Sequence, residues 1–148
     1  MAVNWKKAQR KASRTARWAV TTTKVRIRRI IARTRWQLVT FYGKSGGESV
    51  GIVDVLAIRK DHRTPKAGLS RGDAFQIVLI QVKGGTSARP TPKDWRRLRA
   101  VAERHGATEI LLAIWNKGRA ARFYRPDGND AKGRMSWREL ADLNSVFR

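Results

Sequence analysis

Three polar side chains lie in or beside sequence runs that otherwise predict buried strands. Asp54 interrupts the apolar run at residues 50–58, and Gln81 and Lys83 lie at the end of the apolar run that begins at residue 74. Because residues 81 and 83 are two apart, their side chains project from the same face of a strand. If the two strands pair, Asp54 is expected to lie beside them.

This combination of side chains suits the hydrolysis of a phosphodiester bond. A carboxylate and an amide oxygen are hard ligands for Mg²⁺, which takes few protein ligands and keeps several waters. The bound metal lowers the pKa of a water and offsets the charge that develops on the phosphate. The lysine orients the attacking water or acts as its base.

Short apolar runs and turn residues predict the strands that position these side chains. The run at 50–58 ends in a long loop at 59–73, which is rich in Gly, Pro and basic residues. The next run ends at Lys83 and is followed by two glycines. Alternation and apolar content predict strands at 36–42, 50–58, 74–82, 109–115 and 120–124.

Two helices are predicted in the same region from their capping residues. Thr91 is a candidate N-cap, Pro92 a first helical residue and Asp94 the returning acid of a capping box, and Gly106 ends the helix. A final helix is predicted from Ser136, with Glu139 completing a second capping box. With no repeat and no evident linker, residues 36–148 are predicted to form one α/β core with a C-terminal helix.

The first 44 residues contain no Asp or Glu, and we expect residues 1–35 to form a basic arm on the core. Alanines at helical spacing predict a short amphipathic helix at 4–20, which the threonines at 21–23 interrupt, and residues 25–35 fit a strand or a helix. A transit peptide and a solvated helix face are alternative interpretations. Because acid partners are lacking, an arm that binds nucleic acid is favoured.

The charge of the whole chain favours the same partner. Its 148 residues carry 33 Lys and Arg against 11 Asp and Glu, a formal net charge of +22. Such a chain gains most from a polyanion whose counterions it releases on binding. An anionic membrane surface is the rival, but no apolar run approaches the ~20 residues that span a bilayer. With no cysteine, the composition fits a cytoplasmic, nucleoid-associated protein.

The order of these motifs resembles the PD-(D/E)xK nuclease superfamily over roughly residues 36–125. The resemblance rests on Asp54 within its strand, Gln81 and Lys83 ending the next strand, the helix at 91–105 and the strand at 109–115. It implies a restriction-endonuclease-like fold, a central mixed sheet flanked by helices. It also implies a DNA endonuclease, in which Asp54 and Gln81 bind Mg²⁺ or Mn²⁺ and Lys83 is catalytic.

The chain departs from the pattern of that superfamily in three ways, one of which is that its acid-free N-terminal stretch lacks the Glu that many members have on the first helix. Val53 stands where the superfamily has proline, and Gln81 replaces the second acid, so the metal is expected to bind more weakly or to be Mn²⁺. Glu48, just before the strand of Asp54, is the nearest substitute carboxylate for metal binding and catalysis. A non-catalytic nucleic-acid-binding protein on the same scaffold, architectural or ribosome-associated, is the alternative function.

Basic residues in three regions are predicted to contact nucleic acid, with DNA favoured over RNA. The loop cations are expected to flank the site and grip phosphates. Trp5 and Trp18, which lie between cations, are candidates for stacking on bases or for packing. Branched DNA such as a four-way junction and a homodimer are suggested by analogy with small basic nucleases. The predicted contacts are Lys6, Lys7, Arg10, Arg14, Arg17, Arg59, Lys60, Arg63, Lys66, Arg71, Lys93, Arg96 and Arg97.

Overall fold

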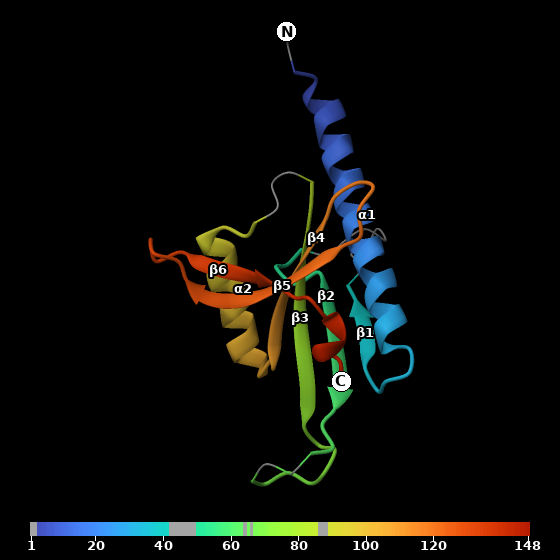
Figure 1. The fold of residues 1–148 in the computed structure, drawn as a ribbon, viewed down its shortest axis with the longest axis vertical. Coiled ribbons are helices and arrows are strands. Elements are labelled where there is room, and N and C mark those ends of the chain that lie inside the picture. The colour runs from blue at the N-terminus through green and yellow to red at the C-terminus, as the bar shows by residue number, and fades with distance from the viewer. Residues whose placement is uncertain (1–2, 42–49, 64, 66, 86–88) are drawn as a thin grey trace.

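The computed structural model describes residues 3–41, 50–63, 65, 67–85 and 89–148 of the chain (Figure 1). Its elements form one α/β arrangement of two α-helices and a mixed sheet. In chain order they are α1 (Trp5–Ile31), β1 (Gln37–Thr40), β2 (Val55–Lys60), β3 (Phe75–Gly84), α2 (Pro92–His105), β4 (Glu109–Trp115), β5 (Arg122–Asn129), β6 (Met135–Glu139) and a 3-10 turn (Leu143–Ser145).

The sheet follows the order of the chain, from β1 at one edge to β6 at the other. β3 and β4 are parallel and are joined through α2, whereas every other neighbouring pair is antiparallel. The predicted α/β class is therefore confirmed. Parallel pairing requires a crossover, and the helix at 92–105 supplies it.

The two helices cover opposite faces of this sheet. Val78 and Ile80 of β3 join the core cluster that contains Ile27 of α1. On the other face, Leu112 of β4 joins a smaller cluster with Leu98 of α2. Since successive strand residues point to opposite faces, even-numbered β3 residues face α1 and odd-numbered residues face α2.

α1 is one continuous helix of 27 residues rather than the short helix that the sequence predicted. The threonines at 21–23 do not interrupt it, because the buried Ala19, Ile27 and Ile31 on either side keep one face of the helix against the core. β-branched residues lower helix propensity only slightly. Burial of Ile27 and Ile31 one and two turns later outweighs that cost and resolves residues 25–31 as helix.

The predicted caps of α2 are confirmed. The hydroxyl of Thr91 accepts from the backbone N–H of Asp94 at 3.1 Å, and the Asp94 carboxylate accepts from the backbone N–H of Thr91 at 3.2 Å. Gly106 ends the helix in the left-handed region at φ 62°, where glycine carries no steric cost.

The predicted C-terminal helix from Ser136 is wrong, because these residues form strand β6 instead. β6 pairs with β5, and Trp137 packs edge-on against Trp95 of α2 with ring centroids 5.6 Å apart. A capping box contributes about 1 kcal/mol, less than burial of a tryptophan provides. The chain then ends in the 3-10 turn, and Phe147 packs edge-on against Trp36 at 5.4 Å.

Strand boundaries differ from the expected ones in four strands. β1 spans Gln37–Thr40 within the predicted 36–42, and β2 ends at Lys60, two residues later than expected. β2 begins only at Val55, since Val50 is exposed and Ile52 turns into the cluster under α2. β3 continues to Gly84, two residues beyond its predicted end. β5 starts two residues later than expected and is longer, because β6 pairs with it. The strand at 109–115 is confirmed.

Candidate functional site

Asp54 and Gln81 lie opposite each other at one end of the β2–β3 pair. The register joins Val55 to Ile80, and one more residue brings Asp54 opposite Gln81. The backbone N–H of Asp54 donates to the carbonyl of Ile80 at 3.0 Å, which extends the ladder by that residue. The Asp54 carboxylate accepts from the backbone N–H of Val82 at 2.6 Å. The structure therefore brings together the residues that the sequence singled out.

Gln81 occupies the inner position of the site. Its side chain is 4% exposed, and its Oε1 is buried with no hydrogen-bond partner among the described residues. An unsatisfied buried acceptor costs about 1–3 kcal/mol. A cation coordinated by this oxygen would offset that cost, so the amide is suited to metal binding.

Lys83 points to the same face of the sheet as Gln81 and meets α2. Its Nζ lies 3.5 Å from Oδ2 of Asp94, the acid in the first turn of that helix. Burial of the Asp94 carboxyl opposes ionisation, but the hydrogen bond from the Thr91 N–H and the nearby Lys83 ammonium outweigh it. The pKa of Asp94 is therefore lowered. Asp94 is ionised at neutral pH and holds the lysine in place.

Asp94 is the site residue that sequence reasoning missed, because it was interpreted only as a capping acid. A signal was present in the order of elements. A helix that follows a parallel strand begins near the carboxyl end of that strand. The first turn of the helix at 92–105 therefore lies near Lys83, and a carboxylate there is a candidate partner.

The oxygen donors of this site fit a hard divalent cation that keeps most of its waters. The carboxylate of Asp54 and the amide oxygen of Gln81 are such donors, and Asp94 lies next to Lys83. Within the described ranges, no three His, Cys, Asp or Glu side chains form a cluster that could hold a metal. Glu48, the third predicted ligand, lies outside the described residues.

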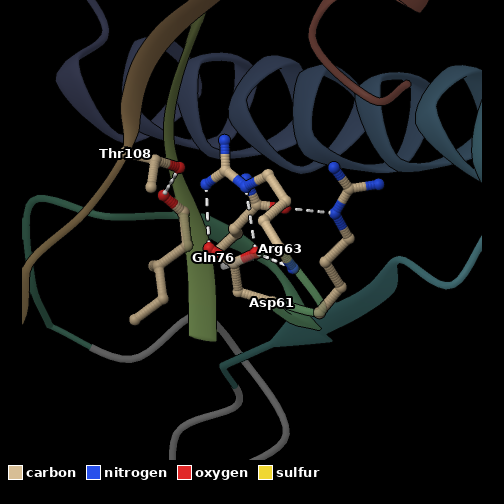
Figure 2. A network of polar contacts seen from close by, with 6 residues as sticks. Asp61, Arg63, Gln76 and Thr108 are labelled. Atoms are coloured by element: carbon tan, nitrogen blue, oxygen red, sulfur yellow. Dashed lines mark hydrogen bonds and ion pairs between the residues drawn. The ribbon is translucent and has the colours of Figure 1, made fainter. Parts of the chain in front are cut away.

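The loop cations lie at the opposite end of β2 and β3, so the expectation that they flank the site is wrong. Gln76, near the start of β3, is seven residues and about 23 Å from Lys83 along the strand. Figure 2 shows the polar network at that far end, where Asp61, Arg63, Gln76 and Thr108 lie. The predicted strands already imply this separation, because the loop joins residue 58 to residue 74 and Lys83 lies at the other end of the second strand.

Several of the loop cations have structural partners in that network. Arg59 donates to Gln76 and lies 4.5 Å over the ring of Trp36. Burial and the neighbouring Arg63 lower the pKa of Arg59, against the opposing effect of Asp61. Arg63 donates to both carboxylate oxygens of Asp61, at 2.9 and 2.8 Å. With Lys60, Arg59 and Arg63 line a cavity of about 250 Å³.

The other two loop cations complete the predicted set. Arg71 donates from Nε to the backbone carbonyl of His62 at 2.9 Å. Lys66 lies outside the described residues. The five loop positions are therefore distant from Asp54 and Lys83 or are not described.

Eight exposed basic residues of α1, in two stretches at 6–17 and 28–29, form a surface that we call the α1 ridge. Successive residues of a helix are rotated by about 100°. This rotation places the side chains of the α1 ridge on the side of the helix opposite Ala19, Thr23 and Ile27, which pack on the sheet. Trp18, 56% exposed, lies among these cations, whereas Trp5 lies in line with the packed face. The α1 ridge consists of Lys6, Lys7, Arg10, Lys11, Arg14, Arg17, Arg28 and Arg29, all exposed.

α1 crosses β3 at the end of the sheet where the candidate site lies. A Cβ built on Gly84 would lie 3.0 Å from the Cβ of Ala19 and 3.2 Å from Cγ2 of Thr15, so the strand and the helix are in close contact there. The residues before Thr15 project beyond the end of β3 (Figure 1). The first half of the α1 ridge therefore extends past the site but faces away from the sheet.

A second basic surface, the α2 outer face, covers the other side of the sheet. It consists of Lys93, Arg96, Arg97 and Arg104, which are exposed and lie opposite the buried Leu98 and Ala102. The acid nearest to it on α2, Glu103, accepts from Arg99 at 2.9 Å. This surface lies on the same side of the sheet as Gln81 and Lys83.

Comparison with known proteins adds no family to this description. No protein-family model matches the chain, and no curated protein matches it. Within the described ranges, neither α1 nor α2 has the length of uncharged, apolar sequence that a membrane-spanning helix requires.

Proposed function

We propose that this chain is a metal-dependent endonuclease that hydrolyses phosphodiester bonds in DNA and has a PD-(D/E)xK-like core. One observation carries the proposal. Asp54, Gln81 and Lys83 meet at one end of the β2–β3 pair, and the buried Gln81 Oε1 has no hydrogen-bond partner among the described residues. A metal ion bound to that oxygen would offset the cost of burying it without a partner.

The arrangement of the elements supports the restriction-endonuclease-like part of the proposal. A helix, three antiparallel strands, a crossover helix and a strand parallel to the third follow one another in α1, β1–β3, α2 and β4. The resemblance noted in the sequence implies a central mixed sheet flanked by helices, and this order of elements agrees with it. The site also lies at the end of β3 where α2 begins, so the crossover helix contributes Asp94 to it.

Each side chain has a separate role in the proposed reaction. Asp54 and Gln81 would hold Mg²⁺ or Mn²⁺, with Glu48 as a further carboxylate. The cation supplies Lewis acidity at the scissile phosphate and lowers the pKa of water. The Lys83 ammonium orients the attacking water or contacts a phosphate oxygen. Asp94 is a positioning residue that holds Lys83 through the 3.5 Å contact.

The test is cleavage of end-labelled linear, flapped and four-way-junction DNA by the purified chain. Reactions contain Mg²⁺, Mn²⁺ or EDTA at the same ionic strength. The proposal requires cutting that depends on the metal, with Mn²⁺ at least as effective as Mg²⁺ because a neutral amide replaces one carboxylate. Tight binding without cutting under either metal would contradict it.

A non-catalytic nucleic-acid-binding protein on the same scaffold is the second candidate. The neutral Gln81 favours it, because an amide binds a hard cation more weakly than a carboxylate does. Under this alternative the basic helices bind DNA while Asp54 has a structural role that includes accepting from the backbone N–H of Val82. Metal titration distinguishes the two candidates. A nuclease site binds Mn²⁺ in a manner that Asp54→Asn weakens, and a simple binder shows no such dependence.

A further inference from the structure

The α1 ridge and the α2 outer face lie on opposite sides of one sheet. α1 packs on the face that contains Val78 and Ile80, and α2 packs on the face that contains Leu112. Each helix turns the basic residues of its surface away from the sheet, because its apolar stripe is buried against the sheet. The two basic surfaces therefore point in opposite directions.

Both surfaces carry charge that the chain itself does little to neutralise. The 27 residues of α1 include no Asp or Glu. On α2, Asp94 faces Lys83 and Glu103 accepts from Arg99, so these two acids already have cationic partners. Exposed cations that lack acidic neighbours are the electrostatic footprint of a surface that contacts phosphates.

The dimensions of the helices suit DNA segments rather than isolated anions. At 1.5 Å per residue, α1 is about 40 Å long and α2 about 21 Å long. Each helix therefore covers several successive phosphates of a strand, which follow at about 3.4 Å along the duplex axis. A straight duplex lying along one helix is separated from the other helix by the sheet.

We propose that the α1 ridge and the α2 outer face bind two separate duplex segments at the same time. The inference rests on the proposed function and deepens it by naming the substrate class, DNA in which two duplex arms meet. The segment on α2 lies on the side of the sheet that Gln81 and Lys83 face. The segment on α1 is held on the other side.

A bridging assay tests this arrangement. A duplex of about 30 base pairs is tethered to beads in EDTA, the protein is added, and capture of a second, fluorescent duplex is measured. The ridge variant carries Lys7→Gln, Arg10→Gln and Arg14→Gln, and the α2 variant carries Lys93→Gln, Arg96→Gln and Arg97→Gln. Each variant removes three positive charges, so each is the matched control for the other.

The expected result is capture by the unmodified chain and at least tenfold less capture by each variant, while each variant still binds a single duplex. Two results would overturn the inference: no capture by the unmodified chain, or capture that survives the α2 substitutions. The second result would mean that a dimer holds one duplex per subunit through α1 alone. Because EDTA prevents metal-dependent cutting, the outcome is independent of catalysis, so bridging and nuclease activity are tested separately.

Discussion

Removing cations from the projecting part of α1 should reduce the salt dependence of DNA binding by a calculable amount. Lys7, Arg10 and Arg14 are exposed, follow one another at helical spacing and span about 10 Å of the helix. That length matches about three successive phosphates on one strand. Glutamine at all three positions removes the charges with little change in helix propensity.

The expected change follows from counterion release. Each phosphate contact contributes about 0.9 to the slope of log K against log salt, so the triple variant should lose about 2.7 from that slope. Between 50 and 200 mM salt, the unmodified chain should therefore lose about 40-fold more affinity than the variant. Fluorescence anisotropy with a labelled 30-base-pair duplex measures both slopes.

A control with the same loss of charge separates the α1 ridge from total charge. Lys132, Arg134 and Arg138 lie in and beside the β5–β6 turn and are exposed. Replacing these three residues by glutamine should leave most of the slope of log K against log salt unchanged. Equal slopes for the two triple variants would refute the role assigned to the α1 ridge.

Three further predictions concern how the fold holds the site. Gly84→Ala should destabilise the chain by about 1–3 kcal/mol in urea unfolding, because its Cβ would lie 3.0 Å from that of Ala19, and Ala19→Gly in the same chain should recover part of the loss. Trp137→Ala should cost about 3–5 kcal/mol in the same assay through lost packing on Trp95, whereas a small effect would argue against the position of β6. The lowered pKa of Asp94 means that its carboxylate contributes stability above the unfolded value of about 3.9, and that this contribution is lost as pH falls through the folded value. Asp94→Asn should therefore flatten the decline in stability below about pH 4, and an unchanged decline would show that this carboxylate does not interact as described.

Local chemistry was sufficient to predict much of the region around the site. The strand at 109–115 and the caps at Thr91 and Gly106 depend on nearby residues, and they lie where the sequence indicated. The approach of Asp54 to Gln81 also followed, because adjacent antiparallel strands leave little choice of neighbour. The roles of these residues in catalysis stay predictions.

The remaining features depend on contacts between distant segments, which local patterns do not reveal. The Ser136 capping box was outweighed by pairing with β5 and by the packing of Trp137 on Trp95. Burial of Ile27 and Ile31 in the core stabilised α1 through a stretch of weak helix formers. The distance of the loop cations from Lys83 was instead implied by the predicted order of strand, loop and strand, although these cations were expected to flank the site.

The most direct test of the central claim is single-turnover cleavage of junction DNA in Mn²⁺ by the unmodified chain and by Asp54→Asn and Lys83→Ala. Asp54→Asn keeps an oxygen that can accept from the Val82 N–H, so it separates metal binding from folding. Asp127→Asn, which alters a carboxylate 3.9 Å from Arg138, is the matched control. The account predicts cutting by the unmodified chain and the control, and a loss of at least a hundredfold in both site variants while DNA affinity is retained. Cutting that persists in Asp54→Asn, or no cutting by the unmodified chain, would contradict the assignment of this site.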